Sequence, residues 1–167
     1  ISGNYPWQEQ VKIVIDSSSP VNHTLALRLP DWCDKPQVTL NGAPVTQDVR
    51  KGYLHISHLW QEGDTLQLTL PMPVRRLYGN PLVRHQAGQV AVQRGPLVYC
   101  LEQADNGEQL HNLQLPRNAG FSAFEGKGIF AHKVILQAPG YKQTAEDAGQ
   151  QALWHYDRAP TTRQPQT

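Results

Sequence analysis

Long apolar runs are absent from this 167-residue chain, and so is an excess of charge of either sign. No stretch approaches the roughly 20 apolar residues that span a bilayer, and no basic-then-apolar N-terminus indicates a signal peptide. With 15 basic and 14 acidic side chains, the formal net charge is +1. So small a charge supplies no field that would attract nucleic acid or an anionic membrane. We therefore expect neither as a partner.

Sulfur-containing residues are also scarce. The only cysteines are Cys33 and Cys100, whose wide separation matches no zinc knuckle and no redox pair. A disulfide between them is one alternative, but a secreted scaffold that relied on bridges would carry more of them. We predict two free thiols in a cytoplasmic protein. Met72 is the only methionine and the chain begins at Ile1, which favours a segment of a longer protein.

Turn residues and alternating apolar residues are what the sequence has in quantity. The 13 glycines and 13 prolines punctuate the chain, and apolar and polar residues alternate between them, as in half-buried strands. The alternating runs are Val11–Ile15, Leu25–Leu29, Val38–Leu40, Leu54–Ile56, Leu66–Leu70 and Val90–Val92. Such closely spaced short strands are typical of antiparallel folds rather than βαβ units. We predict an all-β fold, an antiparallel β-sandwich of jelly-roll-like type.

The alternation weakens after about residue 75. Residues 76–88 are irregular, a strand pair is expected over 89–102 around an Arg-Gly-Pro turn, and residues 103–128 are loop-like. We predict a first β-sandwich module over residues 1–80. Residues 81–159 then form a second, smaller β-sandwich module or a continuation of the first, with the boundary between 76 and 88.

Three local features complete the expected fold. The dipeptide Asn41-Gly42 predicts a two-residue hairpin, because both central positions of a type I′ turn need positive φ. One helix is expected over Thr144–Leu153, with Thr144 as its cap. The tail over 160–167 has no apolar side chain besides proline, so we expect it to fray.

The sequence offers no catalytic constellation. A glycosidase needs two facing carboxylates, but the acidic residues fall at turns, where bonding to their own backbone explains them. These residues are Asp31 and Asp34, Glu62 and Asp64, and Asp105 and Glu108. His55 and His58 are three apart, so a strand places them on opposite faces, and neither Gly-x-Ser-x-Gly nor a phosphate loop occurs. We therefore assign no catalytic, cofactor-binding or metal-ligating residue.

Aromatic residues near strand ends are the remaining candidates for a binding site. Trp32, Tyr53 and Trp60 could form a platform for the faces of sugar rings. Packing is the stronger alternative for each, because Trp and Tyr bury a large area and suit the rim of a sandwich core.

Seven segments follow one another in a recognisable order: GNYPW (3–7), LRLPDWC (27–33), VTLNG (38–42), GY (52–53), WQEGD (60–64), LPMPVR (70–75) and QRGPLVYCLE (93–102). Together they resemble the C-terminal β region of glycoside hydrolase family 127, the β-L-arabinofuranosidase group. The resemblance extends over residues 3 to about 106 and then weakens.

The resemblance implies an (α/α)6 barrel upstream of these β modules. In the family, that barrel carries the active site, with a zinc-bound cysteine nucleophile beside glutamate and cysteine ligands. The Cys-Cys-Pro context of the catalytic cysteines is absent here, so neither Cys33 nor Cys100 matches the nucleophile or a ligand. The resemblance therefore implies no cofactor in this chain and a zinc ion in the catalytic part. Because the family usually continues past Thr167, the chain looks truncated at both ends.

The expected function is that of a non-catalytic β-sandwich portion of a β-L-arabinofuranosidase-like enzyme. Its expected partners are its own catalytic barrel and a second copy in a homodimer, while the carbohydrate substrate belongs to the parent enzyme. An independent carbohydrate-binding module is the alternative. A small self-sufficient hydrolase is a third hypothesis, which the missing nucleophile disfavours.

Overall fold

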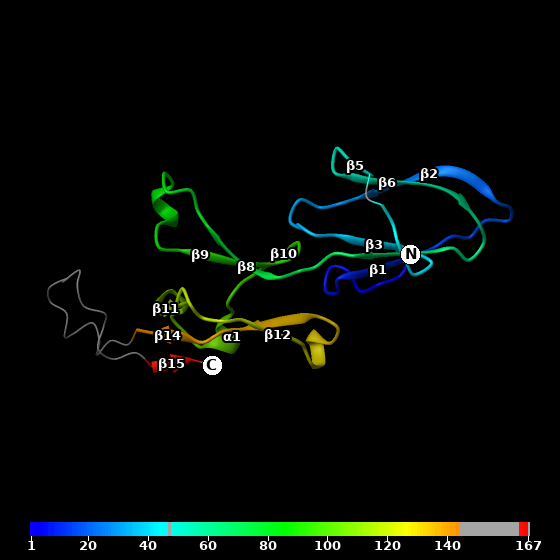
Figure 1. The fold of residues 1–167 in the computed structure, drawn as a ribbon. Coiled ribbons are helices and arrows are strands. Elements are labelled where there is room, and N and C mark those ends of the chain that lie inside the picture. The colour runs from blue at the N-terminus through cyan, green and yellow to red at the C-terminus, as the bar shows by residue number, and fades with distance from the viewer. Residues whose placement is uncertain (47, 144–163, 167) are drawn as a thin grey trace. The chain divides into compact units, whose positions relative to one another are not determined.

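The computed structural model describes residues 1–46, 48–143 and 164–166 (Figure 1). The chain divides into two compact units, Ile1–Val98 and Tyr99–Thr167. Antiparallel strand pairs dominate both units, and the described helices are single short turns. The all-β prediction is confirmed. No helix among the described residues is long and apolar enough to cross a membrane.

The first unit contains two facing sheets, which Figure 1 shows as separate layers. One sheet has the strand order β1 (Gln10–Val14), β7 (Thr65–Thr69), β3 (Gln37–Leu40) and β4 (Ala43–Pro44). The other has the order β2 (Val21–Arg28), β6 (Tyr53–Trp60) and β5 (Asp48–Arg50). The alternating runs predicted in this part of the chain are therefore strands.

The core lies between these two sheets. Along β6, Leu54, Ile56 and Trp60 point inward, as a period of two requires, and they pack in one cluster with Leu66 and Leu68 of β7. Trp60, Leu54 and Leu66 are fully buried. Apolar and polar residues alternate along strands that are far apart in the sequence, and their apolar faces meet in this core.

Two-residue hairpins close two of the strand pairs. Asn41 and Gly42 have φ values of 51° and 83°, and Leu40 pairs with Ala43, which confirms the predicted turn. Between β5 and β6, Lys51 and Gly52 take φ values of 51° and 77°.

A third sheet has the order β10 (Leu97–Tyr99), β9 (Val90–Arg94) and β8 (Val74–Tyr78), with a 3-10 turn, η1 (Arg84–Gln86), between β8 and β9. The strand pair expected around Arg94-Gly95-Pro96 is confirmed. The irregular start expected at 76–78 is wrong, because these residues pair with β9 through their backbones. Two consecutive arginines there interrupt the apolar alternation that would have indicated a strand.

Arg94 ties this third sheet to the sandwich. Its Nη1 donates to the carbonyl of Trp7 over 2.9 Å, and its Nη2 lies 3.7 Å from Glu9 Oε1, which also accepts the backbone N–H of Met72. Gly95 has a φ of 56°, and a Cβ there would lie 2.7 Å from Met72 Sδ. The first compact unit extends to Val98, and the module boundary between 76 and 88 stays a prediction.

The described residues of the second unit form two small sheets and three short turns of helix. One sheet joins β11 (Leu113–Gln114), β14 (Gly140–Lys142) and β15 (Gln164–Gln166), and the other joins β12 (Ser122–Glu125) and β13 (Val134–Gln137). The helical turns are α1 (Gln103–Asn106), η2 (Leu110–Asn112) and η3 (Gly128–Phe130).

Three expectations fall on this second unit. The loop-like assignment of residues 103–128 is wrong where β11 and β12 form; β12 is exposed throughout and has no buried face to impose alternation. In the tail expected to fray, residues 164–166 pair with β14 through their backbone, which needs no apolar side chain. The helix expected over Thr144–Leu153 lies outside the described residues.

Candidate functional site

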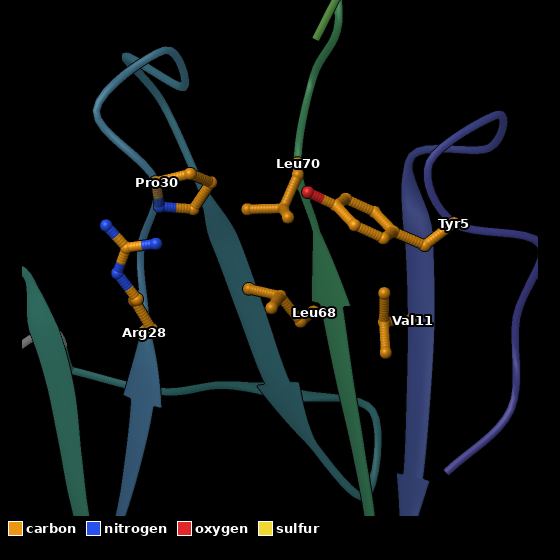
Figure 2. A pocket seen from close by; sticks show the side chains of 6 residues that line it. All are labelled: Tyr5, Val11, Arg28, Pro30, Leu68 and Leu70. Atoms are coloured by element: carbon orange, nitrogen blue, oxygen red, sulfur yellow. The ribbon is translucent and has the colours of Figure 1, made fainter. Parts of the chain in front are cut away.

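A hollow of about 270 Å³ opens at one end of the sandwich (Figure 2). Its lining residues come from both sheets and the loops that adjoin them: Tyr5, Val11, Arg28, Pro30, Leu68 and Leu70. Figure 2 shows Tyr5 and Arg28 on opposite sides of Leu68 and Leu70. The two leucines belong to the buried core, whereas Tyr5 is 46% exposed. The hollow therefore combines an apolar floor with a polar rim.

The lining of this hollow offers polar groups at two positions. Tyr5 offers a ring face and a hydroxyl, and Arg28 offers a guanidinium. None of the lining residues carries a carboxylate, an imidazole or a thiol that could act as a general acid, a general base or a nucleophile. Sequence reasoning missed Arg28 because nothing along the chain indicates that the end of β2 lies near Tyr5.

The three aromatic candidates do not form one platform. Trp60 is fully buried, and its Nε1 donates to the carbonyl of His23 over 3.0 Å. Trp32 is half-buried and packs against the same core. Tyr53 is 43% exposed, but it begins β6 on the face opposite to that of Trp60. Trp60 is therefore a packing residue of the core, as the packing alternative predicts.

A polar cluster surrounds Asp64, one of the acidic residues assigned to a turn. Its Oδ1 accepts from Asn41 Nδ2 and its Oδ2 from the backbone N–H of Gln61, both over 2.8 Å. His58 Nε2 lies 3.6 Å from Oδ2. The hydrogen bond from Asn41, then that from Gln61, then the charge of His58 lower the pKa of the Asp64 carboxyl, and burial opposes them. These contacts explain Asp64 as a structural carboxylate.

This lowered pKa predicts an acid-sensitive fold. A carboxyl whose pKa is lower in the folded state adds stability above its unfolded value of about 3.9, and that stability is lost as the pH falls through the folded value. We expect the unfolding temperature of the wild type to fall as the pH drops below about 4. Asp64→Asn, measured by thermal unfolding from acid to neutral pH, should flatten this dependence while lowering stability at neutral pH. An unchanged slope in the variant would contradict the assignment.

The described residues do not fit a zinc site. No group of three or more His, Cys, Asp or Glu side chains gathers in residues 1–46 and 48–143. Cys33 is buried and Cys100 exposed, and both are free, as predicted. Burial raises the pKa of the Cys33 thiol, which disfavours the thiolate that zinc requires.

Comparisons with known proteins agree on one family. Residues 2–72 match the model of the β-L-arabinofuranosidase GH127 middle domain, and residues 74–155 match the glycoside hydrolase family 127 C-terminal domain. A non-reducing end β-L-arabinofuranosidase of Bifidobacterium longum subsp. longum is 38% identical over 118 residues, which cover 67% of this chain and 18% of that enzyme.

Solved structures give the same result. A GH127 β-L-arabinofuranosidase from Geobacillus stearothermophilus T6 is 38% identical with a TM-score of 0.84, over 99% of this chain and 26% of that one. A second GH127 β-arabinofuranosidase is 30% identical with a TM-score of 0.73, over 85% of this chain and 25% of that one. The chain thus spans about a quarter or less of these relatives, which are larger enzymes in which the matched region is one part. It belongs to glycoside hydrolase family 127 and comprises that family's middle and C-terminal domains.

Proposed function

We propose that this chain is the non-catalytic β portion of a β-L-arabinofuranosidase-like glycoside hydrolase, and that it packs on and supports the catalytic part. The observation that carries the proposal is how the family matches divide the chain. They occupy residues 2–72 and 74–155, and they are the family's middle domain and its C-terminal domain. We place the reacting cysteine and any zinc in that other part, an (α/α)6 barrel.

Exposed apolar side chains support a packing role. Leu82 and Tyr78 are 88% and 61% exposed, and neither lines the hollow of Figure 2. Monomeric proteins expose single apolar residues routinely, but contiguous apolar patches usually mark contacts with other protein surfaces. Residues left in water by this chain are therefore candidates for contact with the rest of a larger enzyme.

The 167-residue chain alone is expected to show no glycosidase activity and to bind no stoichiometric zinc. The sequence indicates no facing carboxylate pair, and no group of three or more His, Cys, Asp or Glu side chains gathers in the described residues. The measurement is turnover of an aryl β-L-arabinofuranoside, with zinc content measured by mass spectrometry. Turnover that disappears when Asp31, Asp34 or Glu62 is replaced would overturn the proposal.

Association of the isolated chain is expected as well, through a sheet face or an unpaired strand edge. Each fully buried Leu or Val contributes about 1.5–3 kcal/mol, so a few such side chains left in water favour contact between copies. Sedimentation at several concentrations should show dimers or slow aggregation. A strictly monomeric chain at high concentration would count against homodimer formation and favour a module that functions independently, such as the carbohydrate-binding alternative.

A further inference from the structure

The strands β8 and β9 and their connection form a region of one charge sign. Between Asp64 and Glu102 the chain has no acidic residue and four arginines, Arg75, Arg76, Arg84 and Arg94. Arg75 pairs with Asp34, and Arg94 lies 3.7 Å from Glu9. Arg84, in η1, makes no ion pair with any described residue. Among the described residues, the positive charge of Arg84 at the end of this hairpin therefore has no acidic partner.

The same hairpin end exposes large apolar side chains. Tyr78 is 61% exposed and Leu82 is 88% exposed, while Leu77 and Val83 are each 42% exposed. We call these four residues and Arg84 the hairpin-end surface. Their number within so short a segment distinguishes them from apolar residues scattered singly over a surface.

The backbone of the hairpin-end surface is folded rather than loose. The N–H of Val83 donates to the carbonyl of Asn80 over 2.8 Å, and that of Leu82 donates to Asn80 Oδ1 over 3.0 Å. The side chain of Gln86 packs against Gly79, because a Cβ added at position 79 would lie only 2.1 Å from Gln86 Oε1. The apolar side chains are thus held out to solvent by a defined turn.

A hollow of about 300 Å³ adjoins this surface. Its lining consists of Leu77, Tyr78, Gly79, Gln86, Gln89, Val90 and Ala91, from both strands and the returning loop. Tightly bound interfaces commonly seat one apolar or aromatic anchor in such a recess and surround it with weaker contacts. The hollow and the exposed side chains together have the anatomy of a docking site.

We propose that the hairpin-end surface docks on the catalytic part of the same family 127 enzyme. The docking segment would place an apolar side chain in the hollow, with one or more carboxylates facing Arg84. This inference rests on the proposed function and adds to it the contact surface and the chemistry of the partner.

The charge of the hairpin-end surface and the size of the complete enzyme favour this occupant over a second copy of the chain. A symmetric contact through the hairpin-end surface would bring Arg84 near its own counterpart, with no acidic residue between positions 65 and 101 to compensate it. The chain covers 26% of the solved Geobacillus relative, so about three quarters of such an enzyme is left to supply the partner surface.

A photo-crosslinking amino acid at position 82 of the complete enzyme tests the proposal. Leu82 is almost fully exposed, so its replacement should not disturb the fold. We expect an intramolecular crosslink to a peptide outside the 167 residues, with acidic residues near the site of attachment. A second enzyme carries the probe at Ile129, which is equally exposed but lies in the other unit.

The outcomes separate the inference from the proposed function. A crosslink from position 129 to the catalytic part, with none from position 82, would overturn the inference and leave the proposed function standing. The absence of any crosslink to the catalytic part from either position would count against both. A crosslink from position 82 to another copy, or to residues 99–167 of the same chain, would also overturn the inference.

Substitution of the same residue gives an independent measurement. Leu82→Ser should leave the unfolding temperature of the 167-residue chain unchanged, yet lower that of the complete enzyme by a few degrees. Arg84→Glu should also loosen docking, and high salt should reduce the difference between this variant and the wild type. Ile129→Ser is the matched control and should leave the complete enzyme unaffected. Equal losses for the Leu82 and Ile129 variants, or none for the Leu82 variant, would refute the docking site.

Discussion

Trp60→Ala is expected to destabilise the first unit by about 3–5 kcal/mol, which is much of the stability of a typical small domain. The side chain is fully buried at the end of β6, in the cluster between the two sheets. The ring of His58 packs edge-on against it with centroids 5.1 Å apart, and its Nε1 donates to the carbonyl of His23. Alanine removes all these contacts and leaves a cavity. Chemical denaturation followed by circular dichroism measures the loss.

Two controls separate packing from sugar binding at this position. Trp60→Phe retains most of the buried area and loses the indole N–H, so it should cost less, about 1–2 kcal/mol. Tyr53→Ala removes an exposed ring from the other face of β6 and should change stability little. If Trp60→Ala left the fold intact but abolished binding of an arabinose-containing oligosaccharide, the packing role would be wrong.

The sequence predicts the sandwich well because its information is local and periodic. Alternation along β1, β2, β6 and β7 survives in the structure, since each of these strands has one face toward a common core. The turn at Asn41-Gly42 is equally local, because two residues determine its backbone angles. β8 and β12 were missed since neither alternates between buried and exposed side chains along its length.

The candidate sites show a different limit. The hollow of Figure 2 joins Tyr5, Arg28 and Leu70, which are distant in the sequence and adjacent only once the sheets have formed. Arg94 likewise contacts Trp7 and Glu9, which lie near the opposite end of the first unit in the sequence. Such contacts leave no periodic signal. The family resemblance implies the enzyme class, whereas the proposed docking of the hairpin-end surface rests on exposed side chains and charge.

Replacement of Asn41-Gly42 by Val-Val is expected to destabilise the fold by about 2–4 kcal/mol through backbone strain alone. The φ values of 51° and 83° lie in the left-handed region, which costs a β-branched residue roughly 1–2 kcal/mol at each position. A Cβ at Gly42 would meet no atom of the rest of the structure within 4 Å, so the cost arises between the Cβ and the adjacent backbone rather than from a clash with a distant neighbour.

A further loss should come from the Asn41 side chain, which joins the hairpin to β7. Its Nδ2 donates to Asp64 and its Oδ1 accepts the backbone N–H of Thr65, both over 2.8 Å. Valine makes neither bond, and Asp64 then loses the main group that lowers its pKa. The stability of the Asn41-Gly42 variant should therefore also depend less on pH in the acid range than that of the wild type.

The hairpin at Lys51-Gly52 provides a matched control for the torsional part. Its φ values of 51° and 77° nearly equal those at Asn41-Gly42, and a Cβ at Gly52 would lie no closer than 3.9 Å to a neighbouring atom. Val-Val at this second turn should thus incur the same strain without the loss of the Asn41 bonds. Denaturant unfolding of both variants gives the side-chain contribution as the difference between them. Equal losses would mean that the bonds of Asn41 add nothing, and no loss in either variant would show that these turns tolerate branched residues and that the type I′ assignment is wrong.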